Sequence, residues 1–527
     1  MTTRRRAALA LCLLAAGVLT LAGAGGAAAA TAAAASAATA AVPQAGPLNP
    51  AFVKALLEPL AGALGKLPDP VDVQLGPAAA ARFAQRAAAL PSSYTSDLPS
   101  SFDLRSLTAA DGVTSYSRLT AVRDQGSLGT CWAFSNIAAL ESELLPGEKW
   151  DFSEDNLVTR SGFGPFPGSY GKARNPYYYG GWDFMAVAYF ARWAGPVSER
   201  SDPYNTPKPP KVDRVLKHVQ GAVMYPGRAA GAAGDLGNDE VKQLVYQNGA
   251  LSVGMYWNND FLAADPATGT DDAYYCPYGA GETYRDETVG ENHGVAIVGW
   301  DDAYPGASFA AQDGITPQGD GAFLVRNSWG AGRFGDAGYF WISYYDRSLA
   351  RDECTSYSRV DPVGNYRRIY QYDKLGWTSA WGFKQAECWG ANRFKARGDG
   401  HIAAVGFYTR VAGTRYAVYG GPSLKRLKLR GSGTSALPGY ATVSLTSPLA
   451  VTRGGRFVVA IRLVSPGTTA ADRSPLAIEN PAARWMSGAV AAPGQSFMSA
   501  DGRRWTDLNA GHPSAQASVC LKAFAVR

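Results

Sequence analysis

The stretch DQGSLGTCWAFSN, Asp124 to Asn136, places one cysteine between a glycine-containing loop and an apolar run. Apolar residues then recur at the spacing of one helix face as far as Leu144, and Pro146 would end that helix. Cys131 therefore lies at a predicted helix N-terminus, where the helix dipole favours a thiolate and lowers the thiol pKa. A cysteine can equally be a small buried residue or half of a disulfide, so position alone leaves three interpretations open.

The whole chain has the composition of a globular protein with more than one domain. Its 527 residues exceed what one core usually supports, and 46% of them are hydrophobic. The formal net charge is +6, of which Arg4, Arg5 and Arg6 contribute three. We expect these arginines to leave with a targeting segment, and the remaining charge is too small to indicate a nucleic-acid partner.

Residues 1–30 have the pattern of a secretory signal peptide. A basic start precedes an apolar stretch from Ala7 to about Leu21, which is too short to span a membrane, and Ala-x-Ala sites follow. Residues 31–97 hold a low-complexity tail and then a stretch that we interpret as a prosegment, with one helix starting near Asn49 and another over 78–90. The sequence thus predicts a secreted, cell-surface or cell-wall protein without a membrane span after signal removal.

Removal of the signal peptide also removes Cys12 and leaves five cysteines. In an oxidising compartment an odd number leaves one thiol unpaired. A nucleophilic cysteine needs a base, and the base needs a partner that orients it. Of the four histidines, His293 precedes an apolar run typical of a buried strand, and a second such run ends at Asn327. If these strands are neighbours, Asn327 can bind one ring nitrogen of His293 while the other faces Cys131.

These segments resemble the papain-like cysteine peptidases (clan CA, family C1). The resemblance rests on DQGSLGTCWAFS, NHGVAIVGW and NSWGAGRFGDAGYFWIS, supported by SFDLRS, FSEDNLV and YYYGGWDF, in the family's order across residues 98–346. It implies an α+β papain-like fold for residues 98–360, with a helical left half and a β-barrel-like right half. It further implies four catalytic residues: the nucleophile Cys131, its imidazolium partner His293, the orienting Asn327, and Gln125 as an oxyanion-hole donor.

The same resemblance implies the substrate-binding residues. Gly180 and Gly181 match the pair whose backbone aligns extended peptides through strand-like hydrogen bonds. Gly254 stands where the family often has a bulkier residue of the S2 subsite. Asp183 would give that subsite an acidic wall that admits a basic P2 side chain, or else be a solvated loop carboxylate. Two further residues complete this set: Asn292, and Trp329, whose indole would cover the histidine–asparagine hydrogen bond.

The sequence departs from the family in three places. Leu128 and Arg160 occupy positions where many relatives have paired cysteines. Both halves of that disulfide are therefore absent, and no unpaired cysteine is left behind. The interval from Cys131 to His293 is long, which predicts surface insertions within 202–240 and 264–290. The helical motifs of many family prosegments are not visible in residues 47–97, so their mode of inhibition is left open.

Residues 366–527 contain short apolar runs separated by Gly, Pro and Ser, which predict an antiparallel β-sandwich. The segments YQYDKLGW, AAVGFYT, SFMSADGRRWTDL and SVCLKAF resemble the lectin-like domain behind some bacterial C1 peptidases. Cys276, Cys354, Cys388 and Cys520 are disulfide candidates, and their sequence leaves three pairings open. A pair within each part, Cys388 with Cys520 and Cys276 with Cys354, would suit the two domains. No cofactor or metal site is expected, and the aspartates of TGTDDAYY (268–275) give structural calcium no support.

The predicted function is that of a secreted cysteine endopeptidase acting on protein or peptide substrates through a Cys131 thioester. The lectin-like domain would direct it to a cell surface, cell wall or glycan. Two alternatives stay open, namely a non-catalytic surface adhesin and an NlpC/P60-like peptidoglycan amidase. The NSWG segment and Gln125 disfavour the amidase, and the presence of all four catalytic residues disfavours the adhesin.

Overall fold

The computed structural model describes residues 42–57, 65–71, 73, 98–164, 175–178, 180–205, 214–228, 238–264, 271–332, 334–466, 473, 475–480, 488–510 and 516–527. The predicted signal peptide and the predicted helix over 78–90 lie outside these residues. Within the described part, no helix is both long enough and apolar enough to cross a membrane.

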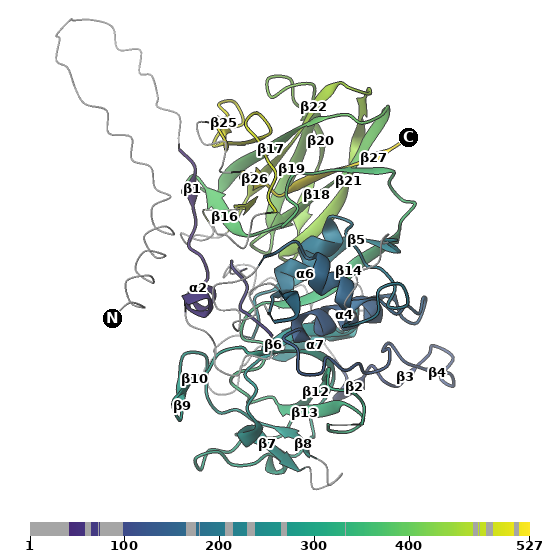
Figure 1. The fold of residues 1–527 in the computed structure, drawn as a ribbon, viewed down its shortest axis with the longest axis vertical. Helices are drawn as coiled ribbons and strands as arrows, with labels where there is room; N and C mark the ends of the chain where they lie inside the picture. Colours follow the sequence, from purple (N-terminus) through teal and green to yellow (C-terminus); the bar gives the residue numbers. More distant parts are fainter. Residues whose placement is uncertain are drawn as a thin grey trace, which may run out of the picture. The chain divides into compact units, whose positions relative to one another are not determined.

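The peptidase part contains four described α-helices, and the candidate nucleophile begins the first of them. They are α4 (Cys131–Leu144), α5 (Glu154–Arg160), α6 (Asp183–Ala191) and α7 (Asn238–Asn248). Helix α4 begins at Cys131 and ends before Pro146, as predicted. It is not amphipathic in the structure, because its residues are buried from Cys131 through Ser142 between strands and the other helices (Figure 1).

One thirteen-stranded sheet runs through both predicted domains. Its order is β15-β27-β18-β21-β5-β14-β6-β11-β12-β13-β8-β7, with β2 added beside β11. The strands are β2 (Ser101–Asp103), β5 (Lys217–Tyr225), β6 (Leu251–Met255), β7 (Leu262–Ala264), β8 (Asp271–Tyr274), β11 (His293–Asp301), β12 (Ala322–Arg326), β13 (Tyr339–Ser343), β14 (Cys354–Pro362), β15 (Arg368–Tyr370), β18 (Gly400–Thr409), β21 (Gly439–Val451) and β27 (Leu521–Val526).

Strand β5 joins the peptidase part to the C-terminal part. It pairs with β14 on one side and with β21 on the other, and Figure 1 shows β5 and β14 between α6 and the C-terminal strands. At this junction Gly439 lies opposite Val223 with a φ of +131°, and a Cβ there would lie 2.1 Å from the carbonyl oxygen of Ala222. The close approach of the two backbones therefore requires glycine.

The C-terminal part is all-β and antiparallel, as predicted. Its second sheet has the order β20-β19-β22-β17-β24-β25, and a smaller sheet has the order β1-β16-β23-β26. These strands are β1 (Gln44–Ala45), β16 (Ser379–Gly382), β17 (Glu387–Lys395), β19 (Thr414–Gly421), β20 (Lys428–Ser435), β22 (Arg456–Val464), β23 (Leu476–Glu479), β24 (Ser496–Ser499), β25 (Thr506–Asp507) and β26 (Ser518–Val519). Aliphatic and aromatic side chains from all three sheets form one core between them.

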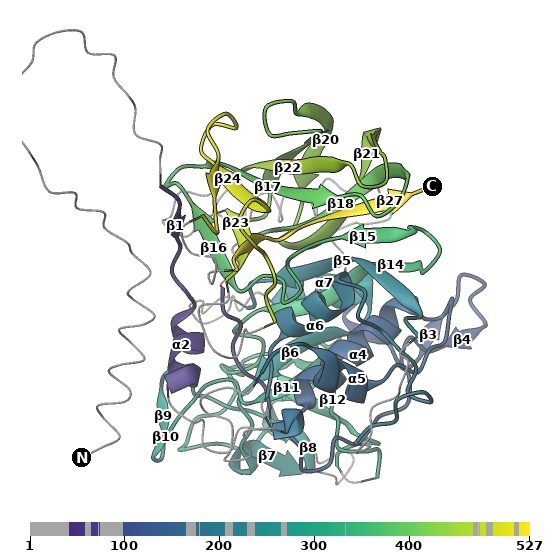
Figure 2. The same cartoon turned by 45° about the horizontal axis from the view of Figure 1, so that its top comes forward.

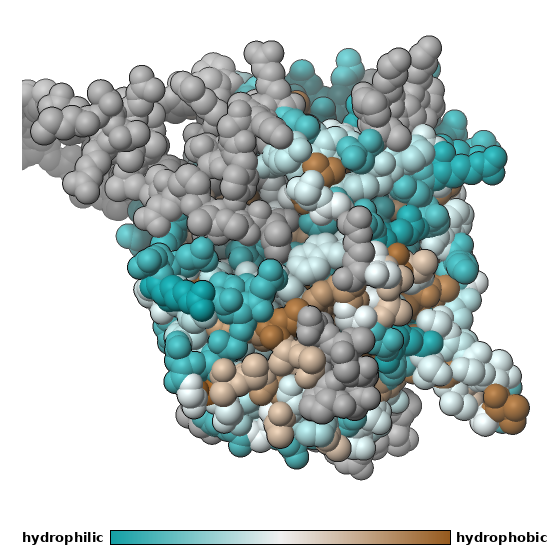
Figure 3. All heavy atoms as spheres, turned by 60° about the horizontal axis from the view of Figure 1, so that its bottom comes forward, coloured by the Kyte–Doolittle hydropathy of each residue, from teal (hydrophilic) through white to brown (hydrophobic). Residues whose placement is uncertain are grey.

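Two short hairpins project from the peptidase part. They are β3 (Leu107–Thr108) with β4 (Ser115–Tyr116), and β9 (Thr283–Tyr284) with β10 (Glu287–Thr288). Between β3 and β4, Val113 is 86% exposed. Figure 3 shows a small apolar patch at the end of a projection from the edge of the molecule.

The N-terminal segment, described for residues 42–57, 65–71 and 73, packs on both parts. Strand β1 pairs with β16 of the C-terminal part (Figure 2), and helix α2 (Pro50–Leu57) follows. The helix begins where predicted, because the Asn49 side chain accepts a hydrogen bond from the Ala51 N–H at 2.9 Å. Phe52 is 1% exposed and meets Trp182 edge-on at 5.2 Å, within the core that α4 and α6 share.

The predicted disulfides are wrong. All five described cysteines are free thiols, and all are buried. Cys388 belongs to the core between the C-terminal sheets, whereas Cys520 faces the core of the peptidase helices. Cys276 and Cys354 share one core, but their thiols point to the carbonyl oxygens of nearby residues in their own loops. Four cysteines serve as small apolar residues.

Candidate active site

Cys131 is the first residue of α4, and its sulfur is fully buried. The backbone N–H of Gly294, at the start of β11, donates a hydrogen bond to Sγ at 3.2 Å. The helix position suggested a lowered thiol pKa, but burial raises the pKa of Cys131 to about 12 in this structure. The Gly294 hydrogen bond and the nearby Lys66 ammonium act in the opposite direction without overcoming burial.

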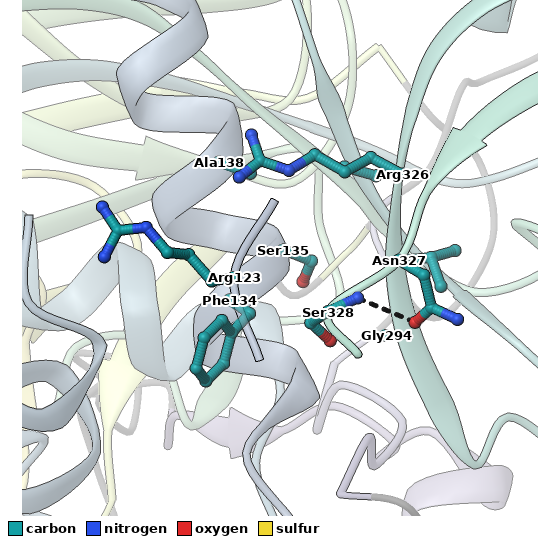
Figure 4. Close-up of a pocket in the computed structure, with 10 residues that line it drawn as sticks. Arg123, Phe134, Ser135, Ala138, Gly294, Arg326, Asn327 and Ser328 are labelled. Carbon is teal, nitrogen blue, oxygen red and sulfur yellow. Dashed lines mark hydrogen bonds between the residues drawn. The ribbon is translucent and has the colours of Figure 1, made fainter. Parts of the chain in front are cut away.

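His293 and Asn327 lie side by side, as the two apolar runs predicted. Strands β11 and β12 are antiparallel neighbours, and Asn327 follows β12 directly. His293 Nε2 is 2.9 Å from Asn327 Oδ1, and that oxygen also accepts the Ser328 N–H at 2.8 Å (Figure 4). Because Oδ1 is the acceptor in both contacts, Nε2 carries the hydrogen and Nδ1 is the basic nitrogen. Burial lowers the pKa of His293 to about 4.

Two tryptophans shield this pair from water. Trp329 stacks on His293 with 4.8 Å between ring centroids and 26° between planes. Trp257 meets Trp329 edge-on at 4.7 Å. Trp257 was not predicted as a site residue, although it lies two residues after the strand that contains Gly254. Both indoles lower the local dielectric around the histidine–asparagine hydrogen bond and thereby strengthen it.

Gln125 is held in one orientation beside Cys131. Its Oε1 accepts a hydrogen bond from Ser328 Oγ at 2.6 Å, and its Nε2 donates to the Leu128 carbonyl at 2.7 Å. The amide nitrogen therefore faces the loop that leads into α4. Gln125 thus binds the Leu128 carbonyl, and this hydrogen bond helps to fix the loop before α4. By the family resemblance, residue 128 is where a disulfide would otherwise hold this loop.

A small cavity of about 10 Å³ lies behind the histidine–asparagine pair. Its lining includes Ser135 of α4, Gly294 of β11, and Asn327 and Ser328 after β12 (Figure 4). This volume has room for about one water molecule, so the back of the site is closely packed. The close packing restricts the side chains that position His293.

The backbone of Gly181 holds an extended peptide, and that peptide is the chain's own N-terminal segment. The Gly181 N–H donates to the Gly65 carbonyl at 2.8 Å, and the Leu67 N–H donates to the Gly181 carbonyl at 2.8 Å, in parallel pairing. A Cβ on Gly181 would lie 2.4 Å from the Trp132 ring. Gly180 has a φ of +70° and approaches the Gly65 carbonyl. The predicted glycine pair is therefore a peptide-binding edge in this structure.

The N-terminal segment crosses from this edge toward His293. The Lys66 N–H donates to the Asn292 carbonyl at 3.4 Å. The Asn292 side chain faces away from the segment, because its amide exchanges two hydrogen bonds with the backbone of Trp257. Asn292 thus contributes its main chain to the contact with residues 65–67, and a Cβ on Gly65 would lie 2.2 Å from Gly129 in the loop before Cys131.

Asp183 lies at the start of α6 and is fully buried, so its interpretation as a solvated loop carboxylate is wrong. Its Oδ1 is 3.0 Å from the ammonium of Lys66 and accepts the Asn136 amide at 2.7 Å. Gly254 lies close by on β6, where a Cβ would be 1.8 Å from Oε2 of Glu291. Glu291 precedes Asn292 and was not predicted, because no local pattern marks a carboxylate that folding buries.

The fold and the site define a papain-like cysteine peptidase domain followed by a lectin-like domain. Residues 98–359 match the model of the papain family cysteine proteases, and residues 369–525 match that of the lectin-like domain. The chain belongs to the papain family of cysteine proteases. The boundaries predicted from sequence for these two parts were 98–360 and 366–527.

Relatives resemble the peptidase part of the chain. A cysteine protease of Blomia tropicalis is 25% identical over 272 residues, covering 50% of this chain and 66% of the relative. Cathepsin S of Bos taurus is 32% identical over 233 residues, covering 42% of this chain and 55% of the relative. The chain thus spans between about half and two thirds of the length of these curated relatives.

Solved structures resemble both parts together. The crystal structure of the cysteine protease and lectin-like domains of Cwp84, a surface layer associated protein of Clostridium difficile, has a TM-score of 0.70 at 23% identity. It covers 92% of this chain and 99% of that chain. The clostridial protease Cwp84 after propeptide cleavage has a TM-score of 0.61 at 24% identity, covering 77% of this chain and 96% of that chain. These likenesses concern the fold.

Proposed function

We propose that the chain is a secreted cysteine endopeptidase whose N-terminal segment is an inhibitory prosegment. The observation that carries the proposal is the placement of Cys131, His293 and Asn327 at one end of a cleft whose edge, Gly181, already holds an extended peptide. Nucleophile, base and orienting residue are the three groups that acyl transfer needs.

After release of the N-terminal segment, His293 Nδ1 takes the proton from Cys131 Sγ. The thiolate attacks the carbonyl carbon of the substrate, and the negative oxygen is bound by Gln125 Nε2 and the Cys131 N–H at the start of α4. The imidazolium then protonates the departing amine, which leaves a thioester on Cys131. His293 next accepts a proton from water, which attacks the thioester carbon. The carbon–sulfur bond breaks, the carboxylic acid product leaves, and the imidazolium returns its proton to the Cys131 thiolate.

The N-terminal segment has the features of a specific inhibitor. It blocks the cleft with residues 65–67, and beyond the cleft Val71 and Val73 are buried in the peptidase core. The Asp69 carboxylate accepts the Phe184 N–H at 3.0 Å in the first turn of α6, and the Val73 N–H donates to Glu353 at 2.9 Å. Such extensive burial keeps the cleft closed until a protease cuts the chain between residues 73 and 98.

The lectin-like domain would hold the peptidase at a cell surface or cell-wall glycan. The signal-peptide pattern in the first 30 residues supports export, and the structurally similar Cwp84 is described as a surface layer associated protein. The continuous sheet through β5 and β21 supports a fixed orientation of the two parts. A peptidase fixed to such a domain would cut substrates near its anchoring site.

The test compares wild type with Cys131→Ala, each as the full chain cut between residues 73 and 98. Wild type should hydrolyse peptides and take up one thiol-directed epoxide on Cys131, whereas Cys131→Ala should do neither. Val113→Ala, at the exposed hairpin tip, is the control and should retain full activity. Peptide cleavage that persists in Cys131→Ala would refute the mechanism, and cleavage of muropeptides alone would favour an amidase. Wild type that binds glycan without cleaving would favour an adhesin.

A further inference from the structure

The N-terminal segment places a buried lysine among three carboxylates, Asp69, Asp183 and Glu291, which are here called the acidic chamber. Lys66 pairs with Gly181 through its backbone, and its side chain is fully buried with Nζ 3.0 Å from Asp183 Oδ1. Burial alone would lower the pKa of Lys66, but the surrounding carboxylates, Asp183 foremost, raise it well above its usual value. The chamber therefore stabilises a cation.

Two of the chamber's carboxylates belong to the peptidase itself. Asp183 is fixed by the Asn136 amide, and Glu291 accepts the Asp352 N–H at 3.1 Å. Among the described residues, Oδ2 of Asp183 and Oε2 of Glu291 are buried without a hydrogen-bond donor. The absence of a side chain at Gly254 makes room for the Glu291 carboxylate. Asp183 therefore contacts the lysine directly, whereas Glu291 acts on it through its charge.

Release of the N-terminal segment changes the charge of the chamber. Lys66 and Asp69 leave together, whereas Asp183 and Glu291 stay. Buried carboxylates without a cation are unfavourable, so they either take up protons or bind a new positive charge. A lysine or arginine side chain of a bound peptide can supply that charge at the place of Lys66.

An adjoining cavity of about 420 Å³ is also lined by acidic side chains. Its lining includes four acidic residues of the peptidase: Asp286, Glu287, Glu291 and Asp352. Among the described residues that line it, the one basic residue is Lys54, which belongs to the N-terminal segment. After that segment leaves, the approach to the chamber is lined by acidic side chains and would attract basic peptides.

We infer that Asp183 and Glu291, with the space left by Gly254, form a cation-selective subsite that takes a lysine or arginine of the substrate where Lys66 now lies. This is the P2 position if a substrate pairs with Gly181 as the N-terminal segment does. The inference rests on the proposed function and names its substrate class as basic peptides.

The first test measures kcat/KM of the cut full chain on fluorogenic peptides that differ only at P2, with lysine, arginine, norleucine or leucine. Lysine should exceed norleucine by about 10- to 100-fold, the usual gain of a charge-assisted contact. Glu291→Gln and Asp183→Asn should each reduce that ratio at least fivefold. Asp239→Asn, whose side chain is 89% exposed on α7, is the matched control and should leave the ratio unchanged.

The second test measures binding without catalysis. A synthetic peptide of residues 60–73 is titrated into the cut Cys131→Ala chain, with lysine or norleucine at position 66. The lysine peptide should bind about tenfold more tightly or better, and Glu291→Gln should remove the difference. Because this test uses Glu291→Gln, it decides the inference even if the Asp183→Asn variant does not fold.

The two tests separate failure of the inference from failure of the proposed function. Efficient cleavage with equal or better rates for leucine at P2 would overturn the cation-selective subsite and leave the peptidase intact. Lysine-dependent binding with no cleavage of any peptide would refute the peptidase and retain the subsite. Equal binding of the lysine and norleucine peptides would overturn the subsite whatever the activity.

Discussion

The substitution Phe52→Ala should open the cleft of the uncut chain. Phe52 lies on α2, is 1% exposed and meets Trp182 edge-on at 5.2 Å in the peptidase core. It lies outside the cleft, so its removal leaves Cys131 and its partners untouched. It weakens the docking of the segment whose residues 65–67 bind the backbone of Gly181 and Asn292.

The expected size of the effect follows from burial. Truncation of a buried phenylalanine to alanine typically costs about 3–5 kcal/mol, from lost apolar contacts and the cavity left behind. Each 1.4 kcal/mol corresponds to a factor of about ten in an equilibrium constant. If the whole cost falls on docking, the fraction of chains with an open cleft rises by at least about 100-fold.

The rate of Cys131 alkylation by iodoacetamide reports that fraction, because the sulfur is fully buried when the segment is docked. Intact-mass kinetics at fixed pH should show an increase of about 100-fold in Phe52→Ala. Val53→Ala, half-buried on the same helix, is the control and should change the rate less than tenfold. A rate for Phe52→Ala within threefold of wild type would refute the idea that helix α2 holds the cleft closed.

Three further predictions concern the catalytic pair, a buried carboxyl and the thiols. Asn327→Ala removes the acceptor for His293 Nε2 and should lower kcat of the cut chain about 100-fold at unchanged KM; an unaltered kcat would contradict the orienting role. Burial raises the pKa of Glu479 from 4.5 to about 8. The folded protein therefore keeps a proton that the unfolded chain loses, and the free energy of unfolding should fall between about pH 4.5 and 8, by up to about 1.4 kcal/mol per pH unit. Guanidinium titrations of Glu479→Gln should lack this decline, and parallel pH profiles would contradict it. Thiol titration of the denatured, unreduced cut chain without residues 1–30, and so without Cys12, should find five free cysteines, whereas a single thiol would restore both predicted disulfides.

Much of the catalytic site could be predicted because its parts are marked by local sequence. A helix that starts at Cys131 follows from the apolar spacing and from Pro146. The ends of two apolar strands carry His293 and Asn327, and neighbouring strands bring them within 2.9 Å. Local backbone preferences decide where such elements begin and end, so residues at their ends can be identified before the fold is known.

The substrate-binding residues were harder to predict from the sequence. Glycine at 181 and aspartate at 183 suggested a substrate edge and an acidic wall, but sequence could not show whether the carboxylate is buried or solvated. Glu291, Trp257 and Lys66 carry no local signal of their role. Their positions depend on contacts between segments far apart in the chain, which sequence periodicity does not encode.

The sequence by itself determined the two-part organisation, the places of Cys131, His293 and Asn327 at the ends of a helix and two strands, and the start of helix α2 near Asn49. Only the tertiary structure decided that the cysteines remain unpaired, that β5 and β21 join both parts in one sheet, and that Lys66 fills an acidic chamber. It also reversed the expected shift of the Cys131 pKa. The physical reason is the same in each case: burial and charge pairing arise from packing between distant segments, whereas helix and strand ends arise from neighbours in the chain.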